Sequence, residues 1–498
     1  MAKPTLRCLN YIDGQWCEAH SGLTLDDDNP SDWRDRVAVY ARSGAEDIDV
    51  AVTAARRAFR SWRLVPAPRR AEYLQRIGEL LNARKEELAQ LMSREMGKVL
   101  IEARGDVQEA IDCAYYYAGE GRRLFGHTAP SEMGDKFAMA IRQPVGVAAL
   151  ITPWNFPVAI PCWKALPALV CGNTLVLKPA EDTPACATVL FEVFEAAGLP
   201  PGVVNLVHGT GEEAGRALVA HPGVDLISFT GSSETGSEVA SVAGRLHKRV
   251  CLELGGKNAQ IVMEDADLDL ALRGALWGAF GTTGQRCTAT SRLILHRAIR
   301  DEFVHRLVEG ARRIKLGPAT DTTTEVGPLI NERQQRRVLS YIEIARDEGC
   351  KVLTGGGIPG DEALAHGWYF EPTILDEVRP TGRIAQEEIF GPVAAVMVVD
   401  SFEEAIDLIN DTPYGLSSSL YTRDVARAFR AIRDIEAGIT YINGPTTGAE
   451  VHLPFGGVKQ TGNGHREAGI AVLDVFSEWK TVYVDFSGQL QRAQIDNR

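Results

Sequence analysis

Residues 145–256 contain five short apolar runs: VGVAALIT (145–152), NTLVLK (173–178), VVNLVHG (203–209), DLISFTG (225–231) and RVCLEL (249–254). Each run has the length and apolar content of a fully buried strand, and helical patterns separate the last four. Alternation of strand and helix is typical of a parallel, doubly wound sheet. The sequence therefore predicts an α/β domain whose ligands bind beyond the carboxyl ends of the strands.

The segments that follow these strands are rich in Gly, Pro and polar residues, as a binding edge requires. They read PWNFP (153–157), KPAED (178–182), HGTGEEAG (208–215) and FTGSSETG (229–236). The glycines at 209, 211 and 215 depart by one residue from the GxGxxG dinucleotide fingerprint, and the best acidic candidate, Glu181, ends the preceding strand. If a dinucleotide binds here, we expect its pyrophosphate not to be held in the usual way.

Patterns outside this region complete a multidomain plan. Most of the first 125 or so residues have helical periodicity, with helices expected over 51–62, 68–96 and 98 to about 124. A second α/β region follows residue 256, and its expected elements are strands SRLILH (291–296), KVLTGG (351–356), AAVMVV (394–399) and SSSLYT (417–422), with helices over 299–314 and 332–348. Residues 136–143 and the terminal WKTVYVDFSG (479–488) alternate like strands and are candidates for pairing between subunits.

These patterns divide the chain into two α/β regions and two arm-like segments, and the family resemblance set out below implies one dinucleotide-binding domain, formed by residues 1–130 and 145–256, and a catalytic domain over 257–445. Residues 131–144 and 475–498 would form oligomerisation arms of a homodimer or homotetramer. The return segment, residues 446–474, would lead the chain back to the cofactor domain.

Composition limits the class of function. The chain has 498 residues, a formal charge of −13 and a pI near 5.4, which disfavours nucleic acid or an anionic membrane as a partner. Its nine cysteines show no CxxC or Cys/His cluster, so neither disulfides nor a metal site is expected. With no secretory signal and no long uncharged apolar run, we expect a cytoplasmic protein.

Three residues are candidates for chemistry, each beside a plainer alternative. Cys287 lies among small and polar residues in GTTGQRCTATS (281–291), unlike the cysteines in apolar surroundings. Arg286 could favour its thiolate or simply pair with a nearby carboxylate. Glu253, at a strand end, is either a general base or a solvated charge. Asn155 is either an amide donor for an oxyanion or a turn residue between prolines.

Taken together, these segments resemble the NAD(P)-dependent aldehyde dehydrogenase superfamily. The motifs occur in order along nearly the whole chain: PWNFP, KPAE, GxGxxxG, FTGS, ELGGKN, GQRC, EEIFGPV, YGLSS and PFGGVKQTGNGHRE. The resemblance implies an aldehyde dehydrogenase-like fold, with a doubly wound parallel-sheet cofactor domain, a second α/β catalytic domain and a small β oligomerisation arm. The superfamily shares the one-residue departure in the glycine motif.

The resemblance also implies roles for named residues. Cys287 would be the nucleophile, Glu253 the general base, and Asn155 part of the oxyanion hole. The aldehyde would be oxidised through a thiohemiacetal and a thioester that water hydrolyses. The residues that match cofactor-binding positions are Lys178, Glu181, Trp154, Gly211, Gly231, Ser232, Leu254, Glu388 and Phe390.

The sequence also bears on the choice of cofactor and of substrate. A carboxylate at the ribose repels a 2′-phosphate, so Glu181 favours NAD, with NADP possible because Lys178 is close by. The stretches PAPRR (66–70), EMGKVLIEARGDVQE (95–109) and GPTTGAE (444–450) are similar to the aminoadipic semialdehyde dehydrogenase branch.

Two kinds of aldehyde thus stay open. Arg286 could pair with the carboxylate of aminoadipic or 2-oxoglutaric semialdehyde, whereas an apolar tunnel for other aldehydes would use Phe156, Trp163, Phe280 and Phe455. The rival classes are a thiol esterase without a cofactor and a binding protein that has lost catalysis.

Overall fold

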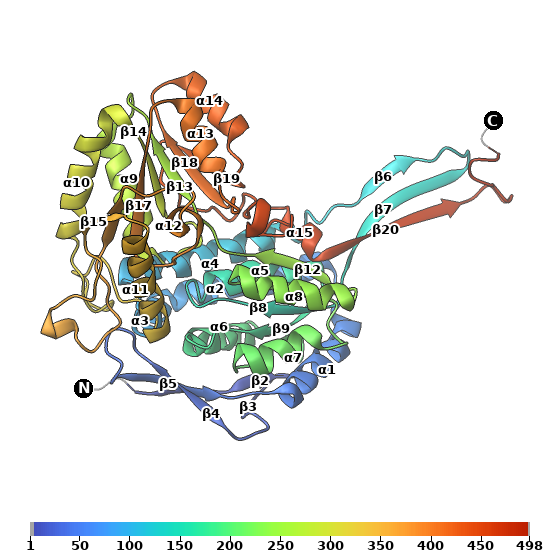
Figure 1. The fold of residues 1–498 in the computed structure, drawn as a ribbon. Coiled ribbons are helices and arrows are strands. Elements are labelled where there is room, and N and C mark those ends of the chain that lie inside the picture. The colour runs from blue at the N-terminus through green and yellow to red at the C-terminus, as the bar shows by residue number, and fades with distance from the viewer. Residues whose placement is uncertain (1–3, 497–498) are drawn as a thin grey trace.

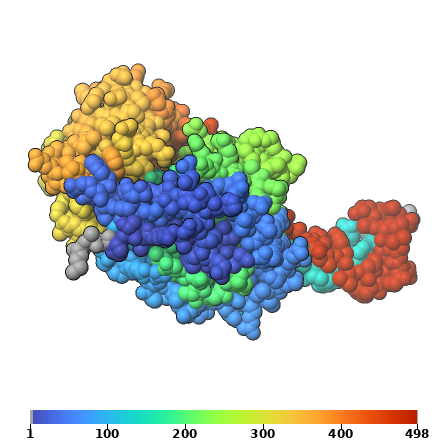
Figure 2. All heavy atoms as spheres, turned by 90° about the horizontal axis from the view of Figure 1, so that it is seen from below, coloured from blue at the N-terminus to red at the C-terminus, as the bar shows by residue number. Residues whose placement is uncertain are grey.

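The computed structural model describes residues 4–496, which form two α/β units and a projecting arm (Figure 1). The chain crosses from the sheet of the first unit to that of the second directly after Glu253, through residues 254–258. A view from below shows the arm standing clear of the body (Figure 2). No helix between residues 4 and 496 combines the length and the apolar run that crossing a bilayer would need.

The first sheet confirms all five strands predicted between residues 145 and 256. Its seven strands lie in the order β12-β11-β8-β9-β10-β2-β3, and β8 to β12 are parallel. The chain runs outward from β8 to β10 and then returns to the other side of β8, so strand order reverses between β8 and β11. The strands are β2 (Asn10–Ile12), β3 (Gln15–Cys17), β8 (Val147–Ile151), β9 (Thr174–Lys178), β10 (Val204–Leu206), β11 (Leu226–Thr230) and β12 (Arg249–Glu253).

Helices cover both faces of this sheet. They are α1 (Ala45–Trp62), α2 (Ala67–Ala83), α3 (Lys85–Met96), α4 (Leu100–Glu120), α5 (Ala159–Cys171), α6 (Pro184–Ala196), α7 (Arg216–Ala220) and α8 (Ser233–Arg245). The single helix predicted over 68–96 is wrong, because the chain breaks at Arg84, which pairs with Glu87 and with Glu192 of α6. The apolar spacing continues across the break, so periodicity alone did not reveal it.

The expectation that the first 125 or so residues are mostly helical is wrong for the N-terminal part. Besides β2 and β3, a separate sheet has the order β1-β5-β4, with β1 (Leu6–Cys8), β4 (Thr24–Asp28) and β5 (Arg36–Ala41). These strands are short, and β4 reads TLDDD, a composition that disfavours a strand. Arg36 on β5 pairs with Asp26 and Asp28, so cross-strand ion pairs support a strand that the pattern did not predict.

The second unit confirms the α/β region predicted after residue 256. Its sheet has the order β15-β16-β17-β14-β13-β18-β19, and its core encloses Phe280, which lies away from both cavities described below. The strands are β13 (Ala259–Val262), β14 (Arg292–His296), β15 (Lys351–Thr354), β16 (Thr373–Asp376), β17 (Val393–Val399), β18 (Ser417–Tyr421) and β19 (Ile439–Ile442). The helices are α9 (Leu268–Phe280), α10 (Arg300–Arg313), α11 (Glu332–Asp347), α12 (Arg383–Gln386), α13 (Phe402–Asn410) and α14 (Val425–Asp434).

The arm is a three-stranded antiparallel sheet in the order β20-β7-β6 (Figure 1). It consists of β6 (His127–Pro130), β7 (Lys136–Pro144) and β20 (Ser477–Asp485), and the short helix α15 (Val472–Val475) precedes β20. The strand character of the two alternating segments is thus confirmed. Their role between subunits, and the domain boundaries, stay predictions.

Candidate active site

A cavity of about 780 Å³ lies beyond β8, β9 and β11 of the first sheet, where strand order reverses. Doubly wound sheets bind ligands at such points. We call it the sheet-end cavity. Among its lining residues are six of those predicted to bind a cofactor: Trp154, Lys178, Glu181, Gly211, Gly231 and Ser232.

Glu181 and Lys178 are tied to the glycine-rich turn at one end of this cavity. The Glu181 carboxylate accepts a hydrogen bond from the backbone N–H of Gly211, which begins a π-helical turn over Gly211–Gly215. Lys178 Nζ donates to Pro179 O at 2.6 Å, and burial lowers the pKa of Lys178 to about 8. A Cβ at Gly215 would lie 3.4 Å from the Lys178 side chain, so the turn packs directly on the lysine.

The N-terminus of α8 faces the same cavity. Ser232 caps the helix, since its Oγ accepts a hydrogen bond from the N–H of Thr235 at 3.2 Å. Ser232 and Thr235 both line the cavity, so the first turn of α8 is open to a ligand. Free N–H groups at a helix N-terminus favour an anion such as a phosphate.

The remaining predicted cofactor residues lie around this cavity without lining it. Glu388 Oε1 accepts a hydrogen bond from Gly256 N at 3.0 Å, and burial raises the pKa of this carboxyl. Phe390 has a positive φ of 61° and meets Trp154 edge-on, with ring centroids 5.4 Å apart. Leu254 packs against Gly236 of α8 and lines the neighbouring cavity instead.

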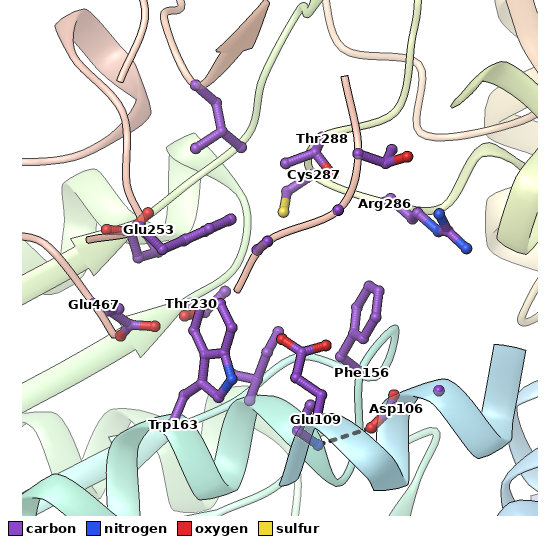
Figure 3. Close-up of a pocket in the computed structure, with 18 of the residues that line it drawn as sticks. Asp106, Glu109, Phe156, Trp163, Thr230, Glu253, Arg286, Cys287, Thr288 and Glu467 are labelled. Carbon is purple, nitrogen blue, oxygen red and sulfur yellow. Dashed lines mark hydrogen bonds between the residues drawn. The ribbon is translucent and has the colours of Figure 1, made fainter. Parts of the chain in front are cut away.

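A second cavity of about 440 Å³ adjoins the first and contains the thiol of Cys287 (Figure 3). We call it the thiol cavity. Glu253 lines it, as do all four residues predicted to contact the substrate, Phe156, Trp163, Arg286 and Phe455. Thr230, the last residue of β11, lines both cavities, and its buried Oγ1 has no hydrogen-bond partner among residues 4–496. The two cavities therefore meet at Thr230.

Cys287 is set in surroundings that keep its thiol protonated. Burial raises the pKa of Cys287 to about 12, and the carboxylates of Glu253 and Glu388 add to this rise. Arg286 does not offset it, because the guanidinium points away from the sulfur (Figure 3). Arg286 pairs with Glu102 at 3.3 Å and lies 4.6 Å from the ring centre of Trp277. The structure thus shows the pairing with a carboxylate that the sequence left open.

The loop before Cys287 is held by α4 and by Asn155. Thr282 and Thr283 adopt positive φ angles of 50° and 58°, a strained conformation for residues with a branched Cβ. Glu102 on α4 fixes Thr282 by accepting bonds from its N–H at 2.9 and 3.0 Å and from its Oγ1 at 2.7 Å. Asn155 Nδ2 donates to Gln285 O at 2.9 Å, which places this amide against the same loop.

Glu253 is the last residue of β12, and its carboxylate is buried with no hydrogen-bond partner on either oxygen among the described residues. Burial and the charge of Glu467 raise the pKa of Glu253 well above its usual value. Glu467 itself pairs with Lys164 and accepts from Ser228 Oγ at 3.2 Å. The Glu253 carboxyl is therefore not committed to any described residue, and its burial and the charge of Glu467 favour its protonated form.

The sequence interpretation missed the paired charges of the thiol cavity. Lys164 is fully buried on α5, in the otherwise apolar run AIPCWKALPALVC, and such a lysine signals a buried partner. Lys98 and Asp106 form a second pair at 2.7 Å with fully buried side chains. Nothing in the local pattern around Glu102 or Glu467 indicated their contacts. Within residues 4–496, no three His, Cys, Asp or Glu side chains gather in a way that could hold a metal ion.

Comparison with known proteins places the chain in a family. Residues 16–482 match the model of the aldehyde dehydrogenase family. The alpha-ketoglutaric semialdehyde dehydrogenase of Bacillus subtilis is 43% identical over 96% of this chain and 98% of its own length. The betaine aldehyde dehydrogenase of the same organism is 41% identical over 95% of this chain and 96% of its own.

Solved structures agree with these sequence matches. A betaine aldehyde dehydrogenase of Staphylococcus aureus in complex with NAD⁺ has a TM-score of 0.95 and 36% identity, covering 97% of this chain and 96% of that one. A putative aldehyde dehydrogenase of Burkholderia cenocepacia has the same TM-score, 0.95, and 41% identity, covering 98% of this chain and 99% of that chain.

Two adjoining cavities at the carboxyl ends of a parallel sheet are typical of α/β enzymes. The chain belongs to the aldehyde dehydrogenase family and is an oxidoreductase that acts on aldehydes. The resemblance inferred from the sequence motifs and the predicted fold class are both confirmed.

Proposed function

We propose that this chain oxidises an aldehyde to the carboxylic acid with NAD, and that Cys287 is the nucleophile. The observation that carries the proposal is that the thiol cavity and the sheet-end cavity meet at Thr230. Hydride transfer requires the two reacting carbons to be within contact distance, and adjoining cavities allow this. The NAD⁺ complex of the Staphylococcus aureus relative supports the choice of cofactor.

The sheet-end cavity has the donors and acceptors that a dinucleotide requires. Lys178 and Glu181 would hold the adenosine ribose, and Glu388 would hold the nicotinamide ribose. The N-terminus of α8 at Ser232 would receive the pyrophosphate. A ligand at the junction would also supply the partner that the buried Thr230 hydroxyl lacks.

NAD is favoured over NADP by the charge at the ribose end. The Glu181 carboxylate, which the Gly211 N–H holds in place, would repel a 2′-phosphate. Lys178 offsets this weakly, because burial lowers its pKa to about 8 and its Nζ is committed to Pro179 O.

In the first half of the reaction, the Cys287 thiol loses its proton and attacks the aldehyde carbon to form a thiohemiacetal. Because Glu253 has free carboxylate oxygens and its charge acts on the thiol, it is the candidate for this proton. Asn155 donates one N–H to Gln285 O, which leaves its second N–H for the oxyanion, beside the N–H of Cys287. Such a donor stabilises the transition state by about 3 to 4 kcal/mol.

Bound NAD would supply the hydride acceptor, and loss of hydride from the thiohemiacetal carbon would leave a thioester on Cys287. Glu253, once it has passed the thiol proton to solvent, takes a proton from water, which attacks the thioester and releases the carboxylic acid and the Cys287 thiolate. Since the pKa of Glu253 is raised, its basic form is present only above that raised value. We therefore expect hydrolysis to accelerate as pH rises through the Glu253 pKa.

A semialdehyde that carries a carboxylate is the second candidate substrate, and Arg286 is the observation that favours it. Arg286 lines the thiol cavity, and its pairing with Glu102 leaves guanidinium N–H groups uncommitted. The alpha-ketoglutaric semialdehyde dehydrogenases among the relatives support this class. Phe156, Trp163 and Phe455 would hold the carbon chain of this substrate or of an uncharged aldehyde.

A homodimer or homotetramer formed through the arm is part of the proposal. Trp479, Tyr483 and Phe486 are exposed on or beside β20, and such side chains are usually covered by a partner. The cytoplasmic location predicted from the sequence is consistent with cysteines that are all unpaired in the described part of the chain.

The test is a panel of uncharged and carboxylate-bearing aldehydes with NAD or NADP, followed by the absorbance of the reduced nicotinamide. We expect oxidation with NAD and a weaker rate with NADP. Hydrolysis of a phenyl ester without any aldehyde oxidation would instead support a thiol esterase. A chain inactive on both would support a protein that has lost catalysis.

A further inference from the structure

Glu109 is a carboxyl group in the thiol cavity that the proposed chemistry does not use. It lies on α4 and points into the cavity from the side opposite Cys287 (Figure 3). It has no hydrogen bond or ion pair to any residue between 4 and 496, although it is partly buried. A carboxyl that is withdrawn from water and left without a partner costs free energy unless a ligand satisfies it.

The other charged groups around Glu109 are already paired. On α4 and just before it, Asp106 is bound to Lys98, and Glu102 is bound to Thr282 and Arg286. Asp112, on the outer face of α4, accepts from Gln108. On other elements, Glu467 pairs with Lys164, and Glu253 is unpaired at the end of β12. Glu109 and Arg286 are thus the charged groups of this cavity with hydrogen-bonding capacity left for a substrate, besides the proposed base.

Two observations favour an anionic over a cationic substrate group beside Glu109. The rings of Phe156 and Trp277, which could attract an ammonium, already have a cation over them, since Lys98 Nζ lies 3.7 Å from the ring centre of Phe156 and Arg286 lies over Trp277. In addition, burial and the Asp106 charge raise the pKa of Glu109 to about 8, so the group is mostly protonated at pH 7. A protonated carboxyl can donate a hydrogen bond to a carboxylate.

We infer that Glu109 is a specificity residue that donates a hydrogen bond to the carboxylate end of a semialdehyde substrate, which Arg286 also binds. This inference rests on the proposed function and assigns the substrate class to the same site. Cys287 would hold the aldehyde end, and the aromatic side chains between them would enclose the carbon chain.

The inference sets a direction of pH dependence. Glu109 donates only while it is protonated, so its bond is present below about pH 8 and is lost as pH rises through that value. Repulsion between two carboxylates then replaces the hydrogen bond. The kcat/KM of a carboxylate-bearing aldehyde should therefore fall above pH 8 relative to that of an uncharged aldehyde.

The experiment measures kcat/KM for glutarate semialdehyde and for hexanal with NAD, in the whole enzyme and between about pH 7 and pH 9. The ratio of the two values cancels the titration of Cys287 and Glu253, which act on both substrates. We expect the ratio at pH 7 to fall about 10-fold or more in Glu109→Ala, the usual scale of a hydrogen bond to a charged group. Glu109→Gln keeps a donor that does not titrate, so its ratio should stay within about threefold and become independent of pH.

Asp112→Asn is the matched control, because Asp112 is exposed on the same helix outside the cavity. Its ratio should follow that of the wild type at every pH. Hexanal turnover in the Glu109 variants reports whether they fold. Unchanged ratios in both Glu109 variants would overturn the inference and leave the proposed function intact. So would a ratio that rises above pH 8, or a gain for aminoaldehydes. Failure of the proposed function would look different, since then no aldehyde would reduce NAD in the wild type.

Discussion

The two cavities adjoin at Thr230, but the chain builds them in different ways. The sheet-end cavity takes most of its lining from the ends of β8, β9 and β11 and from the turns and helices that follow β8, β9, β10 and β11, so most of its residues lie close in sequence to the strand that places them. The thiol cavity collects side chains from α4, α5, the loop before Cys287 and the return segment. Some of its charges are held by partners far away in sequence, such as Lys164 with Glu467. Strand ends therefore make a local site, whereas buried ion pairs make a site that depends on the whole fold.

The largest expected effect is at the thiol. A substitution there should abolish the chemistry of the thiol cavity and leave ligand binding in the sheet-end cavity unchanged. Cys287→Ala should lower dehydrogenase turnover by about 10³-fold or more, because no other nucleophile is available. NAD binding should persist, since none of the sheet-end cavity is altered. Turnover and NAD binding by titration of protein fluorescence would be measured on the same sample. Retained turnover would refute the assignment of the nucleophile.

Glu253→Gln should separate the formation of the thioester from its hydrolysis in time. The variant should give a burst of reduced cofactor close to one per active site and then stall, because water is no longer activated; the burst itself should be slower than in the wild type, because Cys287 has lost its proton acceptor. In the wild type, the steady rate should rise with pH through the raised pKa of Glu253, and the variant should lose this rise. Stopped-flow absorbance from about pH 6 to pH 9 would test both points. An unchanged steady rate would contradict the role of base.

Glu102→Gln tests whether a partner distant in sequence positions the nucleophile. The amide nitrogen of Gln would face the N–H or hydroxyl of Thr282, so the strained loop before Cys287 would shift. We expect kcat to fall about 10- to 100-fold while the KM for NAD stays unchanged. Glu86→Gln is the control, since Glu86 pairs with Arg104 of α4 in an exposed position. Equal effects of the two variants would indicate a general loss of stability.

The smallest effect is expected in the sheet-end cavity. Glu181→Ala should remove the repulsion of a 2′-phosphate and raise kcat/KM for NADP relative to NAD by about 10-fold. The rate of the chemical step should not change. Initial rates with each cofactor at saturating aldehyde would measure the ratio. A fall in kcat with NAD would show that the two cavities are coupled more tightly than their construction implies.

The same contrast explains which parts of the molecule the sequence predicted. The five central strands and the residues after them followed from apolar runs and turn composition, because both signals are local. The family motifs led to the prediction that Cys287, Glu253 and Asn155 belong to one site. Glu109 and Glu102 went unrecognised, since a glutamate on an amphipathic helix looks the same whether it faces water or a cavity. The N-terminal strands were missed because ion pairs with β5 stabilise the acidic β4.

The late position of the return segment, residues 446–474, determines which of the two cavities is completed first during synthesis. Phe455 and Glu467 lie more than 160 residues after Cys287, yet they close the wall of the thiol cavity. Chains fold from the N-terminus as they leave the ribosome. The sheet-end cavity has all of its lining once residue 333 has emerged, whereas the nucleophile stays uncovered until the last tenth or so of the chain is synthesised. A nascent chain that stops short of this segment would carry an open thiol and no pocket to protect it.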